Sequence, residues 1–307
     1  MSPLVSVVMP AFNAASTVSA AIDSVRFQGI DELELIVVDD GSTDATPAVL
    51  DALSMPRLQV LRQTNAGASA ARNRGIAAAR GRYLAFLDAD DVWLAGKLQA
   101  QIEALAGQPG AQVAYGWVNF VDDDGRFVHR DRRPALDGDI YAALLQQNFI
   151  ASGSNILVTR AALDHVGGFD ESLRGVEDWE LNTRLAARFE FVHVPRVVTH
   201  YRKTDDSLSS DVALMEQAFL VARAKVFDAA PPQHRHLAGV CTASFYHYLA
   251  MRFMQTGGWR RAPTKALRLL KTSWSAAPGG NRRVLKALNP LGPLRYAARR
   301  RRPRTHT

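Results

Sequence analysis

Three acidic side chains directly follow one apolar segment of the chain. Asp88, Asp90 and Asp91 come after Tyr83–Leu87, which has the composition of a buried strand. Two carboxylates at positions i and i+2 point into one cleft when a turn breaks the strand's alternation. Mg²⁺ and Mn²⁺ take few carboxylates and complete their shell with water and phosphate oxygens. The pattern indicates a divalent cation site, while a solvated acidic loop remains the alternative because Asp-x-Asp is common by chance.

A second acidic segment, Asp39-Asp40-Gly41-Ser42-Thr43-Asp44, follows the apolar run Leu33–Val38. Asp39, at the expected strand end, is placed to accept hydrogen bonds from a nucleobase edge or a ribose. The alternative is a turn and helix cap, with Ser42 or Thr43 as the capping residue.

Small residues also gather at a predicted helix start, in the segment Asn65–Gly75. A helix N-terminus favours an anion, and Arg72 or Arg74 can reach a diphosphate from it. The segment lacks the Gly-x-Gly-x-x-Gly pattern, so it does not support dinucleotide binding. Close packing of an Ala-rich helix on a sheet is an equal alternative.

A candidate general base lies later in the chain, in Glu177-Asp178-Trp179-Glu180. A carboxylate beside a large aromatic side chain can have its pKa raised by desolvation, which suits proton abstraction near neutral pH. The alternatives are core packing for Trp179 and the usual preference of acidic residues for a helix N-terminus.

The elements that must position these residues alternate between strand and helix over the first 120 residues. Such alternation predicts right-handed βαβ units and a mainly parallel sheet. Asn13, Asp39, Asp40, Asp88 and Asp90 then lie beyond the carboxyl ends of strands, where open α/β sheets bind ligands. The expected strands are Leu4–Met9, Leu33–Val38, Leu58–Leu61, Tyr83–Leu87 and Val113–Val118; the expected helices are Val18–Val25, Thr43–Leu53, Ala68–Ala79 and Leu94–Ala106.

The pattern after residue 120 is looser. Asp122-Asp123-Asp124-Gly125 indicates a hairpin turn between Val118–Val121 and Phe127–His129. Further strands are predicted at Ile156–Val158 and Phe191–Val194, followed by helices over Val212–Phe227, Leu237–Met254 and Ala262–Trp274.

Composition limits the classes of protein. With 47% hydrophobic and 22% charged residues, the 307-residue chain can build a sizeable core. Its single cysteine, Cys241, excludes an intrachain disulfide framework and a Cys-ligated zinc site, which favours a reducing compartment. We see neither a secretory signal nor an apolar run of about 18 residues, so we expect a soluble or surface-bound cytoplasmic protein.

Charge is distributed unevenly along the chain. Residues 229–307 contain 16 of the 37 Lys and Arg residues and no Asp or Glu. In the predicted helix Ala262–Trp274, one face carries Ala266, Leu267, Leu270 and Trp274, and the other carries Arg261, Lys265, Arg268 and Lys271. This fits an anionic membrane surface on the inner face of the membrane. Packing on the body of the protein is the alternative, and nucleic acid is disfavoured because no nucleic-acid-binding motif accompanies the basic residues.

Taken in order, these segments identify a resemblance. The chain from Val5 to Ser209 resembles the family 2 glycosyltransferases, which have the GT-A fold. The resemblance depends on six segments at family-like spacing: Val7–Asn13, Val37–Asp44, Asn65–Gly75, Phe86–Asp91, Gly167–Asp170 and Glu177–Trp179.

The resemblance implies an inverting, metal-dependent transfer of a sugar from a nucleotide diphosphate, with UDP favoured, to an acceptor hydroxyl on a glycan or lipid-linked acceptor. It implies a catalytic domain over 1–209, with a donor half (1–110) and an acceptor half (111–209), and a basic helical region over 210–307. By similarity, Asp178 is the general base, and Asp90 together with Asp91 binds Mn²⁺ or Mg²⁺ on the diphosphate. The donor residues would be Pro10, Phe12, Asn13, Asp39, Arg72 and Asp88; Gly168, Phe169, Asp170, Glu177 and Trp179 would border the sugar and acceptor.

One position departs from the family pattern. Relatives carry a histidine in Tyr-Arg-x-His-x-x-Ser, and this chain has Thr204 there, with Lys203 as a candidate source of positive charge. Two other functions remain open at this stage. A nucleotidyltransferase would need a Gly-rich, Lys-containing loop where Pro10-Ala11-Phe12-Asn13 stands, and a non-enzymatic membrane- or nucleic-acid-binding protein would depend on the basic tail.

Overall fold

A computed structural model describes residues 3–131, 133–203, 211–255 and 262–276 of the chain. Its described residues divide into two compact units. The first comprises those of 1–141 and 149–203, and the second those of 142–148 and 204–307. Thr204 and Lys286–Arg304 of the basic tail lie outside the described residues.

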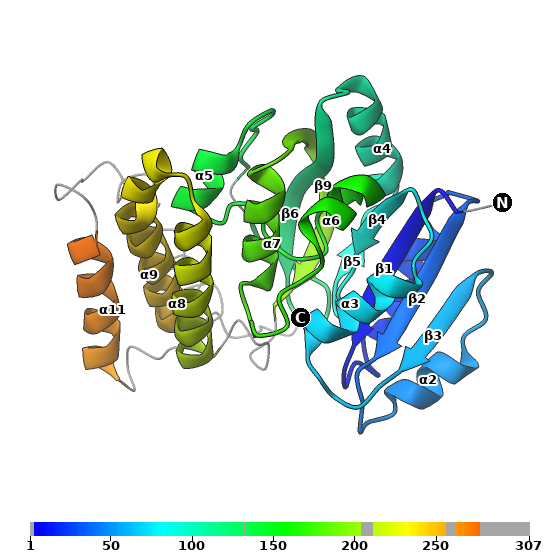
Figure 1. Ribbon diagram of the computed structural model, residues 1–307. Coiled ribbons are helices and arrows are strands. Elements are labelled where there is room, and N and C mark those ends of the chain that lie inside the picture. The colour runs from blue at the N-terminus through cyan, green and yellow to red at the C-terminus, as the bar shows by residue number, and fades with distance from the viewer. Residues whose placement is uncertain (1–2, 132, 204–210, 256–261, 277–307) are drawn as a thin grey trace, which may run out of the picture. The chain divides into compact units, whose positions relative to one another are not determined.

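The first unit is built around a nine-stranded sheet of order β3-β2-β1-β4-β8-β6-β9-β5, with β7 paired to β6 (Figure 1). The four strands of its N-terminal half, β3-β2-β1-β4, are all parallel, as expected for βαβ units. Beyond β4 the sheet is mixed: β8 is antiparallel to both its neighbours, and β6 runs parallel to β9. The strands are β1 (Val5–Ala11), β2 (Leu33–Asp39), β3 (Leu58–Arg62), β4 (Tyr83–Phe86), β5 (Val92–Trp93), β6 (Ala111–Val121), β7 (Phe127–Arg130), β8 (Leu157–Thr159) and β9 (Glu190–Arg202).

Helices connect these strands. Those of the first unit are α1 (Val18–Arg26), α2 (Thr46–Ala52), α3 (Ala68–Ala78), α4 (Lys97–Gly107), α6 (Arg160–Val166) and α7 (Glu177–Ala186). The second unit contains most of α5 (Tyr141–Gln146), together with α8 (Val212–Ala229), the 3₁₀ helix η2 (Pro232–Leu237), α9 (Ala238–Gln255) and α11 (Pro263–Ala276). The predicted α/β fold with C-terminal helices is confirmed.

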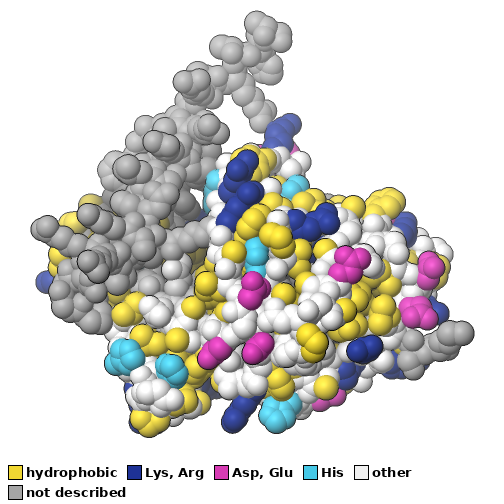
Figure 2. Space-filling model, turned by 90° about the horizontal axis from the view of Figure 1, so that it is seen from above, with side chains coloured by type: hydrophobic (Ala, Val, Ile, Leu, Met, Phe, Trp, Pro, Cys, Tyr) yellow, Lys and Arg dark blue, Asp and Glu magenta, His cyan; other side chains and the backbone are white. Residues whose placement is uncertain are grey.

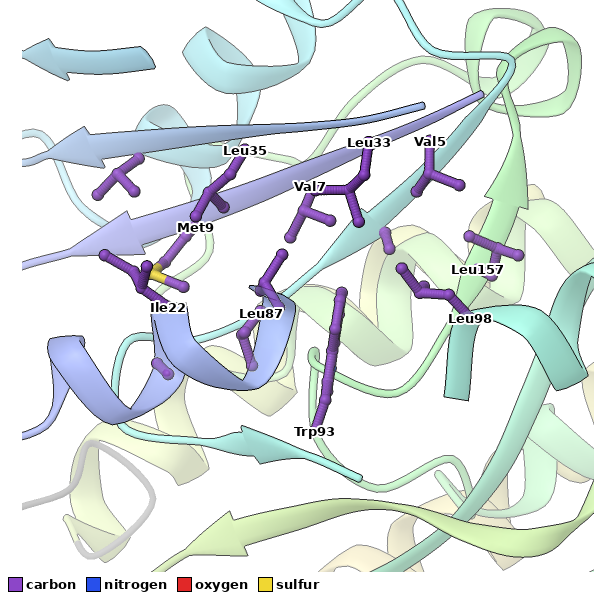
Figure 3. Close-up of a cluster of buried hydrophobic side chains, with 14 of the residues drawn as sticks. Val5, Val7, Met9, Ile22, Leu33, Leu35, Leu87, Trp93, Leu98 and Leu157 are labelled. Carbon is purple, nitrogen blue, oxygen red and sulfur yellow. The ribbon is translucent and has the colours of Figure 1, made fainter. Parts of the chain in front are cut away.

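A hydrophobic core fixes the parallel half of the sheet. Every residue of β2 is buried, because a parallel strand has both faces covered. Figure 3 shows Val7 and Met9 of β1 beside Leu35 of β2, with Ile22 of α1 and Trp93 of β5 packed nearby. This packing holds the carboxyl ends of β1, β2 and β4 at one edge of the sheet, where the loops of the site begin.

Two predicted helices begin later than expected. Helix α2 begins at Thr46 and its N-cap residue is Ala45, so the predicted cap at Ser42 or Thr43 is wrong. Pro47 in the first turn has the φ value that a helix start requires, and it sets the boundary there. Helix α4 begins at Lys97 instead of Leu94, because Val92–Trp93 form a short strand that pairs with β9.

The hairpin predicted at Asp122–Gly125 is confirmed. The Asp122 N–H donates to the Arg126 carbonyl at 3.0 Å, and the Gly125 N–H donates to the Asp122 carbonyl at 2.9 Å. Gly125 has φ +76°, a conformation that glycine adopts without a steric penalty. This turn also contacts the loop after β4, through a residue of β9 described below.

Surface charge is spread out on the face shown in Figure 2. The visible Asp and Glu side chains of the described residues stand in several separate spots, with Lys and Arg among uncharged surface. None of the helices in the described part of the chain has the length and apolar character needed to cross a bilayer.

Candidate functional site

The loops after β1 and β2 are joined by the side chain of Asn13. Its Oδ1 accepts hydrogen bonds from the Thr43 N–H at 2.8 Å and the Asp44 N–H at 3.3 Å, and its own N–H donates to Ser42 Oγ. Asn13 has φ +49°, in the left-handed region that Asn tolerates better than most residues. Of the donor residues predicted on β1 and its loop, Pro10 is half-buried and Phe12 is 50% exposed.

The two aspartates after β2 have different surroundings. Asp39 is buried at the strand end, where its Oδ1 accepts from the Ser42 N–H and its Oδ2 lies 4.0 Å from Arg62 Nε. Asp40 accepts from Gln63 Nε2 and from the N–H groups of Ala66 and Gly67, at 2.7 to 2.9 Å. Asp40 therefore fixes the loop that leads into α3. The sequence pattern did not predict this role.

Arg72 of α3 joins two distant carboxylates. Its Nη2 lies 2.5 Å from Asp88 Oδ1, its Nη1 lies 2.9 Å from Glu177 Oε1, and its guanidinium stands 5.1 Å from the centre of the Phe169 ring. Burial works against its charge, but Asp88 and Glu177 hold the pKa of Arg72 above its usual value. A buried ion pair that loses one partner is strongly destabilising. Arg72 thus connects the loop after β4 to the start of α7.

The aspartates in the loop after β4 have different surroundings. Asp91 is fully buried: its Oδ2 accepts from Ser152 Oγ at 2.8 Å and Ser154 Oγ at 2.6 Å, and its Oδ1 accepts from the Arg202 N–H at 3.0 Å. Burial and the charges of Asp90 and Asp88 raise its pKa well above the usual range. All three hydrogen bonds tie Asp91 to the framework of the site.

The Asp90 carboxylate, in contrast, receives no hydrogen bond or ion pair from another residue in the described part of the chain. Burial, and after it the charge of Asp88, raises the pKa of Asp90 to about 6. The half-buried Asp90 carboxylate and the Asp88 carboxylate repel each other, and a bound cation would offset that repulsion. The described residues include no group of three or more His, Cys, Asp or Glu placed to hold a metal. Asp90, with the charge of Asp88 beside it, fits a cation that takes one or two carboxylates and completes its shell with water and substrate oxygens.

Arg202, near the end of β9, positions this loop. Its Nε donates to the Asp90 carbonyl at 2.9 Å, and its Nη1 donates to the carbonyls of Asp122 and Asp123 in the hairpin turn. Together with the bond from its N–H to Asp91, Arg202 holds two acidic loops in place. Lys203 follows it and places its Nζ 5.1 Å from the centre of the Phe120 ring.

Asp178 lies in the first turn of α7 and lines a small hollow. Burial, and after it the charge of Glu177, raises the pKa of Asp178 to about 7, while Arg72 lowers it. The Trp179 N–H donates to Asp178 Oδ1 at 2.7 Å. We call this cavity the Asp178 hollow; it is lined by Ser152, Gly153, Ile156, Phe169, Asp178, Leu181 and Asn182.

Backbone strain marks two loops at this hollow. Val176, the N-cap residue of α7, has φ +59°, and Ser152 has φ +65°. A β-branched residue in the left-handed region is a true outlier, and such strain costs about 1–3 kcal/mol and concentrates at functional sites. The Gly175 N–H, just before Val176, donates to Glu177 Oε2 at 2.8 Å and holds the strained turn.

The Gly167–Asp170 segment is held against α3 by Asn73. Asn73 Oδ1 accepts from the Phe169 N–H, and its Nδ2 donates to the Phe169 carbonyl, both at 2.8 Å. The buried Phe169 ring packs edge-on against Phe86, with centroids 5.0 Å apart. Asp170 accepts from the N–H and Oγ of Ser172, so its carboxylate forms a turn.

The structure joins five of the predicted residues around α3 and α7, whereas Asn13 and Asp39 bond within the loops after β1 and β2. Asp88, Arg72 and Glu177 form a chain of ion pairs, and Asp178 and Phe169 share the hollow. Trp179 is buried beside Asp178, as its aromatic character suggested. Sequence reasoning missed the positioning side chains Asp40, Asn73, Ser154 and Arg202. Only Asp40 and Asn73 lie within the six segments that carried the family resemblance, and neither type of side chain signals its positioning role without coordinates.

Comparisons with known proteins show the family of the chain. Residues 6–167 match the family model described as glycosyl transferase family 2, so the chain belongs to the family 2 glycosyltransferases. It is 43% identical to the succinoglycan biosynthesis protein ExoO of Rhizobium meliloti strain 1021 over 260 residues, covering 77% of this chain and 74% of ExoO.

Two further proteins are informative. The glucosyltransferase WfgD of Escherichia coli, named a UDP-Glc:alpha-D-GlcNAc-diphosphoundecaprenol beta-1,3-glucosyltransferase, is 40% identical over 129 residues, covering 41% of this chain and about half (51%) of WfgD. The solved mannosyltransferase PcManGT of Pyrobaculum calidifontis, in complex with GDP-Man and Mn²⁺, superposes with a TM-score of 0.60 at 22% identity. It covers 98% of this chain and 87% of its own, which shows the shared GT-A fold.

Proposed function

We propose that this glycosyltransferase is an inverting enzyme that transfers a sugar from a nucleotide-diphosphate sugar to an acceptor hydroxyl. The observation that carries the proposal is the position of Asp178: it lines the hollow, its pKa is raised to about 7, and its neighbour Glu177 is joined through Arg72 to Asp88. A carboxylate with this pKa is suited to act as a general base near neutral pH.

The donor would lie along the edge formed by the ends of β1, β2 and β4. We assign Pro10, Phe12 and Asp39 to binding of the donor's nucleobase, and Asn13 joins the two loops that carry them. We assign Asp88 to binding of the ribose or the sugar. Arg72 positions the Asp88 carboxylate and does not reach the diphosphate, because both Nη atoms of Arg72 are already paired. The names of WfgD and PcManGT include UDP-Glc and GDP-Man, which supports a nucleotide-diphosphate sugar; we favour UDP.

Asp90 is assigned to Mn²⁺ or Mg²⁺, with Asp91 beside it as a buried support. When bound, the cation supplies positive charge to the departing diphosphate. The Asp90 carboxylate lacks a partner among the described residues, whereas Asp91 already accepts three hydrogen bonds. The Mn²⁺ in the PcManGT complex supports this choice of metal.

Asp178 would take the proton of the acceptor hydroxyl as its oxygen bonds to C1 of the donor sugar. The bond from C1 to the diphosphate oxygen breaks at the same time, and the nucleotide leaves with that electron pair. A single displacement of this kind inverts the configuration at C1. Gly168, Phe169, Asp170, Glu177 and Trp179 would border the sugar and acceptor. Asn73 holds the backbone of Phe169, and Arg72 holds the side chain of Glu177.

The names of two relatives support an acceptor class. ExoO is named for succinoglycan biosynthesis, and the name of WfgD gives a diphosphoundecaprenol acceptor. We infer that this enzyme acts in cell-surface polysaccharide or glycolipid biosynthesis, on a lipid-linked or growing glycan. In this chain we assign residues 1–110 to the donor half, 111–209 to the acceptor half and 210–307 to a membrane-associated region.

The second unit offers a surface for such a membrane. In α11, Ala266, Leu269 and Ser273 are buried, so the predicted face that joined Ala266 to Leu267, Leu270 and Trp274 is wrong. Ser273 Oγ donates to the Ala243 carbonyl of α9 at 2.7 Å, and Arg268 pairs with Glu216 of α8. The exposed stripe on α11 consists of Leu267 (65%), Leu270 (36%) and Trp274 (54%).

This stripe has the chemistry of an anionic bilayer surface. Trp and Leu side chains bury at the boundary between head groups and acyl chains, and each nearby Lys or Arg adds about 1 kcal/mol with anionic lipids. Residues 229–307 contain no acidic residue to oppose this attraction. We therefore place the enzyme in the cytoplasm, peripheral on the inner face of the membrane.

Turnover of a donor panel tests the proposed function. The protein is incubated with UDP-, GDP- and dTDP-sugars, MnCl₂ and a set of glycoside acceptors, and release of the nucleoside diphosphate is measured. We expect release from one donor class, and a loss of about 100-fold or more in Asp178→Asn and in Asp90→Ala. Asp164→Ala, an exposed aspartate on α6, is the control and should retain wild-type turnover. No release from any donor, or unchanged turnover in both site variants, refutes the proposal.

A further inference from the structure

A second polar side chain faces the Asp178 hollow. Asn182 lies four residues after Asp178 in α7, and both line the cavity. Residues at i and i+4 share one face of a helix, with Cβ atoms about 5–6 Å apart. A group that enters the Asp178 hollow can therefore contact both side chains at once.

The amide of Asn182 is buried without being satisfied. Asn182 is only 2% exposed, and its Oδ1 accepts no hydrogen bond from any residue in the described part of the chain. Leaving such a group unpaired costs stability, so folded proteins rarely keep one without a use. An apolar residue would suit this position better if packing were its only task.

The other walls of the hollow do not supply the missing partner. Ile156, Phe169 and Leu181 are apolar, and the hydroxyl of Ser152 already donates to Asp91 Oδ2 at 2.8 Å. The partner of the Asn182 amide is therefore not found among the side chains that surround it.

The hollow also borders the donor side of the site. A Cβ added at Gly153 would lie 3.3 Å from Arg72 Nη2 and 3.6 Å from Asp88 Oδ2. The cavity that holds Asp178 and Asn182 thus shares a wall with the Arg72–Asp88 pair. A substituent in it lies between the proposed donor edge and the proposed base.

The room in the hollow limits what can bind there. It has room for one group about the size of a water molecule, so it takes one sugar hydroxyl, while the half-buried Asp178 remains accessible to a neighbouring hydroxyl from outside it. A sugar hydroxyl has this size and can both donate to Oδ1 and accept from the amide nitrogen. A methyl group would fill the space and leave the amide unpaired.

We propose that Asn182 is a specificity-determining residue: its side-chain amide binds a second hydroxyl of the acceptor sugar, beside the hydroxyl that Asp178 deprotonates. This inference rests on the proposed function, because it takes Asp178 as the base on the acceptor side. The acceptor is favoured over the donor sugar because Asn182 continues the helix face of Asp178, one turn further on.

The test pairs enzyme variants with acceptor analogues. Asn182→Leu keeps the size of the side chain and removes the amide. Transfer is measured with methyl glucoside, galactoside, mannoside and N-acetylglucosaminide, and then with each monodeoxy form of the best acceptor. We expect Asn182→Leu to lose about 10- to 100-fold in kcat/KM for the intact acceptor, with the donor KM unchanged. On the one monodeoxy acceptor that lacks the bound hydroxyl, variant and wild type should agree to within about twofold.

A stability measurement separates this role from a structural one. Removing an unpaired buried amide should leave the melting temperature equal or higher, whereas a structural amide would lower it when replaced. Asn182→Ala is a second variant in case the leucine does not fold. Asn119→Leu is the matched control, since Asn119 Oδ1 on β6 is also buried without a partner but does not line the hollow.

Two results overturn the inference. One is wild-type kcat/KM for the intact acceptor in both Asn182 variants; the other is the same loss on every deoxy acceptor, which would indicate a general disturbance. If the wild type itself transfers sugar from no donor, the proposed function fails, and the role of Asn182 fails with it.

Discussion

The raised pKa of Asp178 predicts how the rate of the proposed enzyme depends on pH. Because burial and Glu177 raise its pKa to about 7, a base at this position becomes active as pH rises through 7. We expect kcat/KM of the wild type to increase over this range, and Asp178→Asn to lose about 10²- to 10⁴-fold without a pH step near 7. A profile with the same step in the variant would show that another group titrates. Rates with the best donor across pH 5–9 provide the check.

The same raised pKa predicts the sign of a stability change. The folded state binds the Asp178 proton more tightly than the unfolded chain, so ionising this group costs stability between about pH 4 and pH 7. Asp178→Asn should therefore be more stable than the wild type above pH 7, and the difference should vanish below about pH 4. Urea unfolding at pH 4.5 and 8 measures it, and a variant less stable than the wild type at pH 8 would contradict the account.

Arg72 is the residue whose loss should damage the site most broadly. Arg72→Lys cannot contact Asp88 and Glu177 together, because a lysine presents one ammonium in place of the two-pronged guanidinium. We expect a loss of about 3 kcal/mol in the free energy of unfolding. Arg74→Lys is the matched control: Arg74 is exposed on the same helix, and its change should stay within about 0.5 kcal/mol. Equal effects of the two changes would refute the central position of Arg72.

At the scale of elements, the packing of α3 against the Gly167–Asp170 segment decides where Phe169 lies. A Cβ at Gly168 would come 2.3 Å from Asn73 Oδ1, the atom that holds the Phe169 N–H. Gly168→Ala should therefore displace this segment, cost about 1–3 kcal/mol and lower acceptor turnover more than donor binding. Gly107→Ala, at the end of α4 with open space around it, is the control and should be neutral. Thermal melts and steady-state rates distinguish them.

The strands and helices that carry the site were predictable from sequence because their apolar periodicity is strong. The apolar runs at Val5–Ala11 and Leu33–Asp39 have no competing interpretation, and their order along the chain fixes a parallel sheet. The two-residue strand Val92–Trp93 was not predictable, since its existence depends on β9, about 100 residues away in the chain. The side chain of Asp40 shows the same limit: its three partners in the 63–67 loop are set by the fold and not by any local pattern.

At the scale of the whole molecule, the proposed membrane binding falls to the second unit, because the basic residues and the exposed apolar stripe of α11 both belong to it. Leu267→Glu together with Trp274→Glu should reduce cosedimentation with phosphatidylglycerol vesicles by about tenfold or more, because both changes place charge on the exposed stripe of α11. Leu220→Glu on α8, which is 48% exposed, is the control and should bind like the wild type. Equal binding by all three proteins would remove α11 from the membrane surface.

The most direct test of the account is the structure of the protein with Mn²⁺ and the donor that the panel identifies. It should show the nucleobase against Asp39, the cation between Asp90 and the diphosphate, and C1 of the sugar facing the hollow of Asp178. A donor bound away from the ends of β1, β2 and β4, or a C1 atom turned away from Asp178, would contradict it.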